Sequence, residues 1–436
     1  MRRLIDMADI AAYLTQELGG RLQALGVSLD GPLAVAVSGG PDSLALALLL
    51  KDCPLMTALT VDHGLRAESS HEAEYVAGLS MRAGFRHETL RWHGDKPNAN
   101  LQAEARVARY RLMADWCREN EVSYLLTAHH QEDQAETLLL RLGRGSGVYG
   151  LAAMPEISEV PGYEDIALVR PLLAISKALL RNYLLNAGVE WVEDPSNLNS
   201  SFERVKVRQF LQSPPLDGYS VERLAATARR MRRSREALEF YERQWLCVSV
   251  MEREPAYCFL SYASLAAAPE DVVLRGLAAI CRQFAGADYT PRMEKLERLL
   301  DAMRDDAFAG ATLSGTVFKP DAEGVIICRE LSSCVERSNV QDGSDWDNRF
   351  EISAIGDTRG LEIGVLGDDG WKQAVTKWPD LRGISVPHIA RLVQPGIFDA
   401  QQLRALPLMG YSDLKDVTLH LSRKPLIRSK NRAGSD

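Results

Sequence analysis

The chain has no arrangement of cysteines that would support a disulfide frame or a metal centre. Its 436 residues contain seven cysteines, an odd number, and no two of them are spaced as CxxC. Cysteines of a zinc site or an iron–sulfur cluster usually come in close pairs, and those of a disulfide frame are even in number. We therefore predict reduced and mostly buried thiols.

The sequence also lacks long apolar runs and a positive net charge. No window has the apolar length of a membrane span, and Asp6 and Asp9 follow Met1 so closely that there is no signal-peptide core. We therefore expect a cytoplasmic protein with no membrane partner. The net charge of −8 argues against a globally basic nucleic-acid binder, although it leaves room for a local basic patch.

The first half of the chain alternates strand-like and helix-like segments. Leu33–Val37 is typical of a short buried strand, and the apolar stretch Leu44–Leu50 follows it as a helix. Further strands are expected at 55–61, 86–92, 122–127 and 168–172, and further helices at 69–83, 99–120, 131–142 and 176–186. This order predicts an α/β fold with a doubly wound, mostly parallel sheet. Ligands of such sheets bind at the carboxyl ends of the strands.

The pattern changes after a proline-containing segment at 213–218, which we interpret as a linker. Helices are expected at 221–245, 269–284 and 291–303, and Thr290 and Pro291 suit the start of the last one. A strand pair is expected at 311–318 and 324–330. We therefore predict an α/β domain over residues 1–215, a mainly helical domain over 216–335 and a small α+β domain over 349–421.

A glycine turn joins the first predicted strand to the first predicted helix. Two glycines permit close approach of a ligand, and the helix start offers unpaired N–H groups and a positive dipole end. The serines add hydroxyl donors, and Asp42 is suited to hold Mg²⁺ against phosphates. The turn lacks the lysine of a Walker motif, so it is either another kind of phosphate loop or a plain Gly-Pro turn. Its residues are Ser38, Gly39, Gly40, Pro41, Asp42 and Ser43.

Polar groups follow other predicted strands as well. Asp62 and His63 come after the second strand and suit a nucleotide-contacting turn, although a structural turn is an equal alternative. Arg106 and Arg109 share one face of the helix expected at 99–120. They either meet phosphate oxygens or form a solvated charged face.

His130, Asp133 and Glu136 step by three residues from a strand end into a helix. They therefore lie along one side of its first two turns. Such a group can bind a cation, orient a base edge or accept a proton. Helix capping by acids explains Glu132 and Asp133 but neither His130 nor Glu136, so we favour the functional interpretation.

As a set, these segments resemble one branch of the PP-loop family of N-type ATP pyrophosphatases, the tRNA(Ile)-lysidine synthetases. The resemblance covers about the first 210 residues and keeps the order of the motifs. The chain departs from it at Glu132, where the family often has aspartate. The matching segments are Ser38–Ser43, Val61–Arg66, Asn100–Tyr110, Ala128–Thr137, Arg144–Gly147, Arg170–Leu173 and Trp191–Asn197.

The resemblance implies a two-step ligase reaction that uses ATP and Mg²⁺ and is carried out by the domain at 1–215. The wobble cytosine of the tRNA(Ile) CAU anticodon attacks the α-phosphate of ATP, and free L-lysine then expels AMP to give lysidine. The resemblance assigns the metal to Asp42. It assigns ATP binding to Ser38–Ser43, Asp62, His63 and Arg106, and catalysis to Asp42, His130, Asp133, Glu136 and Arg109.

Transfer RNA needs a positive surface, and residues 202–235 carry nine cations against three acids. We predict contacts with the anticodon stem-loop from this stretch and from the loop after the helix at 131–142. A solvated helix face with acidic partners elsewhere in the fold is the alternative. The two domains at 216–335 and 349–421 are also expected to contact tRNA. The expected contact residues are Arg144, Arg204, Arg208, Arg229, Arg230, Arg232 and Arg233.

Two other functions remain open. The related 2-thiocytidine synthetases use the same loop but need paired or persulfide-carrying cysteines, and the chain has no CxxC pair. A non-catalytic nucleotide- or RNA-binding module would explain the sheet and the loop. It would not explain the histidine and carboxylates that follow the strands.

Overall fold

The computed structural model describes residues 9–64, 68–94, 101–192, 203–214, 216, 218–253, 256–286 and 290–423. Parts of three sequence motifs, at residues 65–66, 100 and 193–197, and the basic tail after 423 lie outside the described residues. The chain divides into two compact units, and the boundary between Arg235 and Glu236 falls inside a helix rather than at the linker expected at 213–218. Each unit is described by itself.

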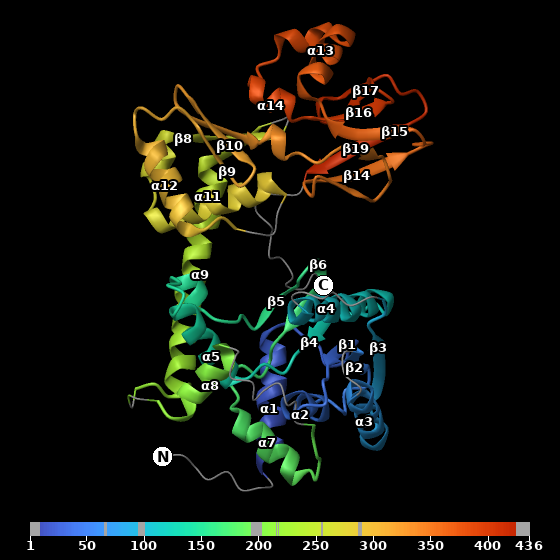
Figure 1. The fold of residues 1–436 in the computed structure, drawn as a ribbon, viewed down its shortest axis with the longest axis vertical. Helices are drawn as coiled ribbons and strands as arrows, with labels where there is room; N and C mark the ends of the chain where they lie inside the picture. Colours follow the sequence, from blue (N-terminus) through green and yellow to red (C-terminus); the bar gives the residue numbers. More distant parts are fainter. Residues whose placement is uncertain are drawn as a thin grey trace. The chain divides into compact units, whose positions relative to one another are not determined.

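A six-stranded sheet forms the centre of the first unit (Figure 1). Five of its strands are parallel, and β5 runs antiparallel at one edge. The doubly wound, mostly parallel sheet predicted from the sequence is confirmed, while the hairpin of β5 with β6 was not predicted. In spatial order the strands are β3 (Arg86–Arg91), β2 (Met56–Asp62), β1 (Leu33–Ala36), β4 (Tyr124–Leu126), β6 (Tyr163–Val169) and β5 (Ile157–Val160).

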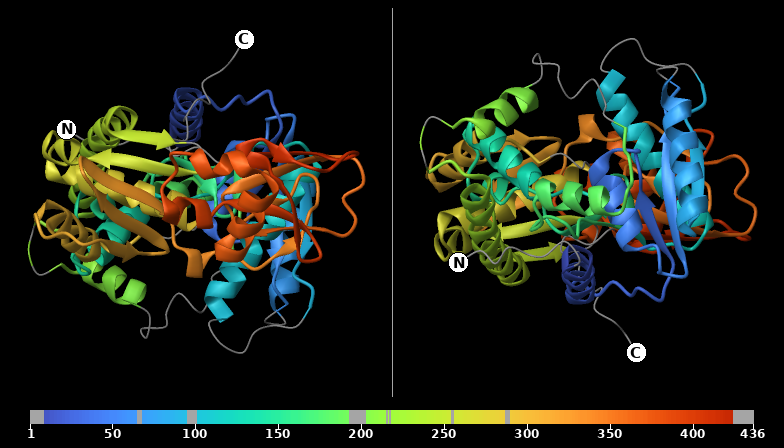
Figure 2. Two further views of the ribbon diagram at one scale, coloured as in Figure 1. Left: turned by 90° about the horizontal axis from the view of Figure 1, so that it is seen from above. Right: turned by 90° about the horizontal axis from the view of Figure 1, so that it is seen from below.

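Helices cover both faces of this sheet, because successive strand residues point to opposite sides. Leu33 and Val35 pack with α1, α2, α3 and α7, whereas Ala34 packs with α4 (Figures 1 and 2). No helix in the described part of the chain is both long and apolar enough to cross a membrane. The helices are α1 (Asp9–Ala24), α2 (Pro41–Leu49), α3 (Glu68–Ala83), α4 (Leu101–Glu119), α5 (Gln131–Leu142), α6 (Val148–Leu151), α7 (Lys177–Asn186) and α8 (Glu203–Gln212).

The strand order reverses at β1. The chain passes from β1 to β2 on one side and later returns to β4 on the other side. Since β1 and β4 are parallel neighbours, the loops that follow them leave the same edge of the sheet side by side. Open parallel sheets bind their ligands in the crevice at such a reversal.

The second unit begins with a five-stranded antiparallel sheet. Helices α11 and α12 and the end of α9 share one hydrophobic core with this sheet. The region expected to be mainly helical therefore combines helices with a sheet. The elements are α9 (Val221–Ser249), β7 (Val250–Arg253), β8 (Tyr257–Ser261), α10 (Tyr262–Ala266), α11 (Glu270–Ala285), α12 (Met293–Arg304), β9 (Ala311–Leu313), β10 (Thr316–Asp321) and β11 (Gly324–Arg329).

Helix α12 begins later than the sequence indicated. Its N-cap is Arg292, so Thr290 and Pro291 precede the helix and the predicted start was wrong. The predicted apolar stripe is confirmed, because one face of α12 is fully buried against the sheet. The buried residues of this stripe are Leu296, Leu299, Leu300 and Met303.

The last part of the second unit contains a five-stranded and a three-stranded antiparallel sheet. A buried ion cluster connects it with the preceding sheet. Asp347 accepts hydrogen bonds from Arg329 at 3.0 Å and from Arg349 at 2.8 Å. The elements are β12 (Ser338–Asn339), β13 (Asp345–Trp346), β14 (Phe350–Ile355), β15 (Leu361–Val365), α13 (Gly367–Lys377), α14 (His388–Leu392), β16 (Pro395–Asp399), β17 (Gln402–Leu406), β18 (Tyr411–Ser412) and β19 (Thr418–Arg423).

Candidate active site

The glycine turn after β1 has the backbone of an anion site. Gly39 has a φ of +79°, in the left-handed region where a side chain is strained, and its carbonyl accepts the N–H of Val192 at 3.0 Å. Gly40 is the N-cap of α2, and no described side chain caps this helix. The first N–H groups of α2 and the positive end of its dipole are therefore left for a ligand.

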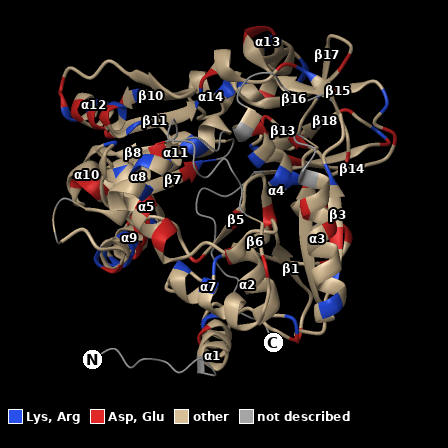
Figure 3. Ribbon diagram, turned by 60° about the horizontal axis from the view of Figure 1, so that its bottom comes forward, with Lys and Arg blue, Asp and Glu red and all other residues tan. Residues whose placement is uncertain are grey.

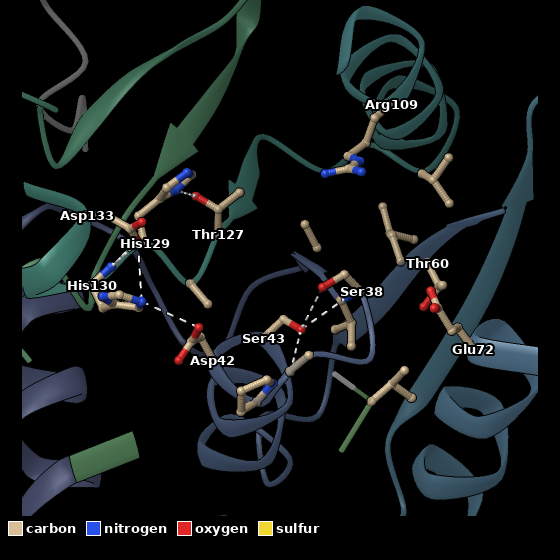
Figure 4. A pocket seen from close by; sticks show the side chains of 18 of the residues that line it. Ser38, Asp42, Ser43, Thr60, Glu72, Arg109, Thr127, His129, His130 and Asp133 are labelled. Atoms are coloured by element: carbon tan, nitrogen blue, oxygen red, sulfur yellow. Dashed lines mark hydrogen bonds and ion pairs between the residues drawn. The ribbon is translucent and has the colours of Figure 1, made fainter. Parts of the chain in front are cut away.

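The two serines of the turn hold its shape. The Ser43 hydroxyl donates to the Gly40 carbonyl at 3.0 Å and accepts the Ser38 N–H at 3.1 Å. The two hydroxyl oxygens lie 3.3 Å apart (Figure 4). These bonds fix the turn, and a fixed turn loses less conformational entropy when it binds a phosphate.

His130 connects the loop after β4 with the loop after β1. Its Nε2 lies 3.4 Å from Asp42 Oδ2 and 3.5 Å from Asp133 Oδ2 (Figure 4). Its Nδ1 lies 3.1 Å from Glu132 Oε2. Burial by itself lowers the pKa of His130, but Asp42, Glu132 and Asp133 outweigh this effect and raise the pKa to about 10. The side chain is therefore an imidazolium at neutral pH and cannot accept another proton.

The neighbouring His129 is neutral. Its Nδ1 lies 3.0 Å from Thr127 Oγ1, and burial lowers its pKa to about 4. The loop after β4 thus presents one charged and one neutral imidazole. Both line the same pocket. His129 was not predicted as a site residue, because only His130 shares the three-residue spacing of the helical acids.

Arginines of α8 pair with the carboxylates of α5. Arg204 donates to Asp133 at 3.2 Å and to Glu136 at 2.8 Å, and Arg208 donates to the other oxygen of Glu136 at 2.8 Å. Glu136 is only 2% exposed, so these cations balance a charge that burial would otherwise make costly. Burial also acts on the pKa of Asp133, but His130 and Arg204 outweigh it and lower that pKa.

These pairs change the interpretation of two predicted tRNA contacts. Arg204 and Arg208 were expected on a tRNA-facing surface, and the structure places both beside the acids of α5. Arg208 also lines the pocket. Such acidic partners are what the alternative interpretation expects, and a tRNA contact by these two arginines stays a prediction.

A pocket of about 450 Å³ lies between the loops after β1 and β4. This volume is in the range of about 300–1,000 Å³ that is typical of small-molecule sites. Arg109 extends into the pocket from α4, across from Asp42 (Figure 4), and its Nη2 lies 3.0 Å from His63 Nε2. Arg106 also lines the pocket and donates to the Tyr110 hydroxyl at 3.4 Å. Apolar side chains also line the pocket: Ala36, Leu59, Val61 and Met113.

Asp62 orders the turn after β2 and is not part of the pocket lining. Its carboxylate accepts the N–H of Gly64 at 2.9 Å and the hydroxyl of Ser70 at 3.0 Å. His63 does line the pocket. Of these two predicted ATP-contacting residues, His63 is therefore the one placed to meet a ligand.

Three charged residues that line the pocket were not predicted from the sequence: Glu72 of α3 and Lys177 and Arg181 of α7. Lys177 Nζ lies 3.6 Å from Asp42 Oδ2. Two cations four residues apart at a helix start were visible in the sequence. Nothing in the linear sequence showed that this helix start returns to the first loop.

Asp42 suits a magnesium ion that is shared with a nucleotide. Its Oδ1 is buried and has no hydrogen-bond partner among the described residues. The described ranges contain no group of three or more His, Cys, Asp or Glu side chains that could hold a metal ion. Mg²⁺ commonly binds one or two carboxylates and completes its shell with phosphate oxygens and water. The donor set therefore fits a metal that arrives with the phosphates.

The other arginines that were predicted to contact tRNA are of two kinds, those that are exposed without an ion pair among the described residues and those that form ion pairs. Arg229, Arg230 and Arg233 are exposed on α9. Arg232 is mostly buried, lies 3.3 Å from Glu156 and donates to the Met154 carbonyl at 3.0 Å. Exposed Arg144 pairs with exposed Glu203 of α8 at 2.8 Å. The first three are therefore the predicted contact residues best placed to meet a polyanion.

Known proteins resemble this chain over most of its length. Residues 16–214 match the family model described as PP-loop domain. The tRNA(Ile)-lysidine synthase of Ruegeria pomeroyi is 38% identical over 387 residues, which cover 87% of this chain and 89% of that protein. The tRNA(Ile)-lysidine synthases of Wolbachia pipientis and a Bradyrhizobium species are 36% and 39% identical. These matches cover 75% and 66% of this chain and 78% and 83% of those proteins.

The two adjacent histidines should differ in charge across neutral pH. In ligand-free protein labelled with nitrogen-15 histidine, the His130 ring should keep imidazolium shifts from about pH 5.5 to about pH 8.5, because its raised pKa lies above this window. The His129 ring should stay neutral throughout, because its lowered pKa lies below the window. His130→Gln and His129→Gln assign the two signals. A His130 signal that titrates near pH 6.5 would contradict the ion network around it.

Proposed function

The chain belongs to the tRNA(Ile)-lysidine synthase family, and we propose that it uses ATP to join L-lysine to the wobble cytidine of the tRNA(Ile) CAU anticodon. It is a ligase that forms a carbon–nitrogen bond and uses ATP. The family and enzyme class predicted from the motifs are confirmed. The proposed mechanism rests on the contacts of His130 with Asp42 of the phosphate loop and with Asp133 of α5. These contacts bring the phosphate loop and the acidic start of α5 together in one pocket.

In the first step, the carbonyl oxygen at carbon 2 of the cytosine attacks the α-phosphorus of ATP and pyrophosphate leaves. The turn at Ser38–Ser43 and the start of α2 bind the phosphates through N–H groups and hydroxyls. Arg109 and Arg106 balance phosphate charge from α4. A magnesium ion on Asp42 would neutralise charge on the phosphate oxygens. The His130 imidazolium holds Asp42 in place, which keeps that carboxylate directed at the nucleotide.

In the second step, the amine of lysine attacks carbon 2 and AMP leaves. The amine must lose a proton before it attacks. Because His130 is already protonated, that proton passes to a carboxylate of α5, Asp133 or Glu136. We assign the lysine or the base edge to the carboxylates Asp133 and Glu136, which bind cations and accept hydrogen bonds. Their present partners, Arg204 and Arg208, lie on a different helix and mark the position that a ligand cation would share or take over.

We propose that the exposed arginines of α9 contact the anticodon stem-loop. Lysine and arginine positions are blue in Figure 3. Arginine forks bind phosphate oxygens and fix the register of a nucleic acid without reading its sequence. The domains at 216–335 and 349–421 are proposed to contact other parts of the tRNA. Because the substrate is a transfer RNA, we place the reaction in the cytoplasm.

The structure offers no support for a thiolation reaction. All seven cysteines are free, and none of them lines the pocket. Burial raises the pKa of Cys117, Cys281 and Cys328 to about 12, so these thiols are poor nucleophiles. A non-catalytic binding module would bind ATP without forming AMP or incorporating lysine into tRNA.

Incubation with ATP, labelled lysine and total bacterial tRNA should place the label in a modified cytidine, with one AMP formed per lysine. Asp42→Asn and Glu136→Gln should each lower the rate roughly a hundredfold or more, because each removes a charge from the reaction site. Glu119→Gln, an exposed acid at the end of α4, is the matched control and should retain the parent rate. Formation of ADP and orthophosphate, or ATP binding without lysine incorporation, would overturn the proposed function.

Charge reversal at Arg229, Arg230 and Arg233 should weaken tRNA binding and leave ATP binding unchanged. Each lost phosphate contact should also flatten the slope of log K against log salt by about 0.7 to 0.9. Arg232 is left intact, because its buried pair with Glu156 would confound the result.

The matched control reverses three exposed arginines on another surface of the same unit, Arg82, Arg86 and Arg91. It produces the same change in net charge, so a purely global charge effect would weaken binding equally in both variants. Equal affinities and equal salt slopes for the two variants would refute the assignment of tRNA contacts to α9.

A further inference from the structure

Lysine and arginine side chains line the pocket from three helices, and the one from α8, Arg208, is paired with a carboxylate of α5. Arg106 and Arg109 enter from α4, and Lys177 and Arg181 enter from α7. Residues four apart on a helix share a face, so Lys177 and Arg181 lie one above the other on the side of α7 that faces the pocket. The proposed reaction steps give no role to Lys177 and Arg181.

The start of α7 is fixed against the start of α5. The backbone N–H of Lys177 donates to Glu132 Oε2 at 2.9 Å, and the N–H of Gln131 donates to the carbonyl of Ile175 at 2.9 Å. Glu132 is also the carboxylate beside His130 Nδ1, at 3.1 Å. Glu132 therefore couples the charged histidine to the helix that carries the second pair of cations.

The position of Lys177 is set by this frame. Leu180 and Leu184 bury one face of α7 in the core that also contains α2. Lys177 lies on the same face one turn earlier, at the end of α7 that meets the phosphate loop, where its Nζ lies 3.6 Å from Asp42 Oδ2. A phosphate held by a metal ion on Asp42 would therefore lie on the side of the pocket where this ammonium group is found.

We propose that Lys177 and Arg181 bind the β- and γ-phosphates of ATP and stabilise the departing pyrophosphate. Helix α7 then supplies, from outside the loop, the lysine that a Walker motif carries within it. The inference rests on the proposed function for the identity of the attacking group. It concerns the leaving group, so it can be tested without tRNA.

The charge balance of the step explains why cations are needed here. As the cytosine oxygen forms its bond to the α-phosphorus, the bond from that phosphorus to the bridging oxygen of the β-phosphate breaks. The electron pair of the broken bond stays on pyrophosphate, which gains negative charge. An ammonium and a guanidinium placed beside that oxygen stabilise the charge as it develops. Lysine acts as a point charge and arginine as a fork, so the two bind different phosphate oxygens.

The decisive measurement is direct binding of inorganic pyrophosphate with Mg²⁺ to the full chain by calorimetry. Lys177→Ala and Arg181→Ala should each weaken pyrophosphate binding about tenfold or more, because each removes a charge-assisted contact. Binding of AMP should change less than twofold. Lys177→Arg keeps the charge and should restore most of the affinity. The control is Lys51→Ala, an exposed lysine beyond the end of α2, which should bind like the parent protein.

A purely structural role for Lys177 predicts a different result. In that case Lys177→Ala would lower the thermal unfolding midpoint and leave pyrophosphate affinity equal to that of the Lys51→Ala control. Equal pyrophosphate affinity in these two variants, with both folded by circular dichroism, overturns the inference. If the parent protein fails to modify tRNA while Lys177→Ala still loses pyrophosphate binding, the proposed function fails and the inference about α7 stands.

Discussion

The site depends on one buried cation, the imidazolium of His130, which holds three carboxylates together. Asp42 comes from the loop after β1, whereas Glu132 and Asp133 come from the first turn of α5. These acids would repel one another in a pocket of low dielectric without a positive charge between them. The adjacency of β1 and β4 makes the arrangement possible, because it brings the two loops to the same edge of the sheet.

The same principle of paired charges extends outward from this centre. Arg204 and Arg208 balance Asp133 and Glu136, and Glu132 holds the backbone at the start of α7. Acidic and basic groups are therefore paired around the pocket, and the proposed phosphate contacts come from its cations. Such an arrangement is preorganised, because the dipoles and charges need little rearrangement when a transition state forms. One carboxylate oxygen of the pocket, Asp42 Oδ1, is buried without a hydrogen-bond partner among the described residues, and this oxygen suits a metal ion.

Much of the first unit was predictable from local sequence, because strand and helix periodicity and the glycine turn are local properties. The spacing of His130, Asp133 and Glu136 likewise indicated a shared helix face. Long-range pairing was not predictable. Nothing local shows that Arg204 and Arg208 turn inward to α5 while Arg229 stays exposed, since all belong to one basic stretch. The start of α12 was misplaced for a related reason: Pro291 fits a first helical position, but tertiary packing begins the helix at Met293.

In the proposed reaction, the oxygen at carbon 2 of the wobble cytosine attacks the α-phosphorus of ATP. A tRNA that carries oxygen-18 at this carbonyl reports the path of that oxygen when the products of the reaction with ATP and lysine are analysed by mass spectrometry. If the cytosine oxygen attacks the α-phosphorus, the label will appear in the phosphate of AMP and pyrophosphate will remain unlabelled. Label retained in the modified nucleoside, or found in orthophosphate beside ADP, would contradict this mechanism.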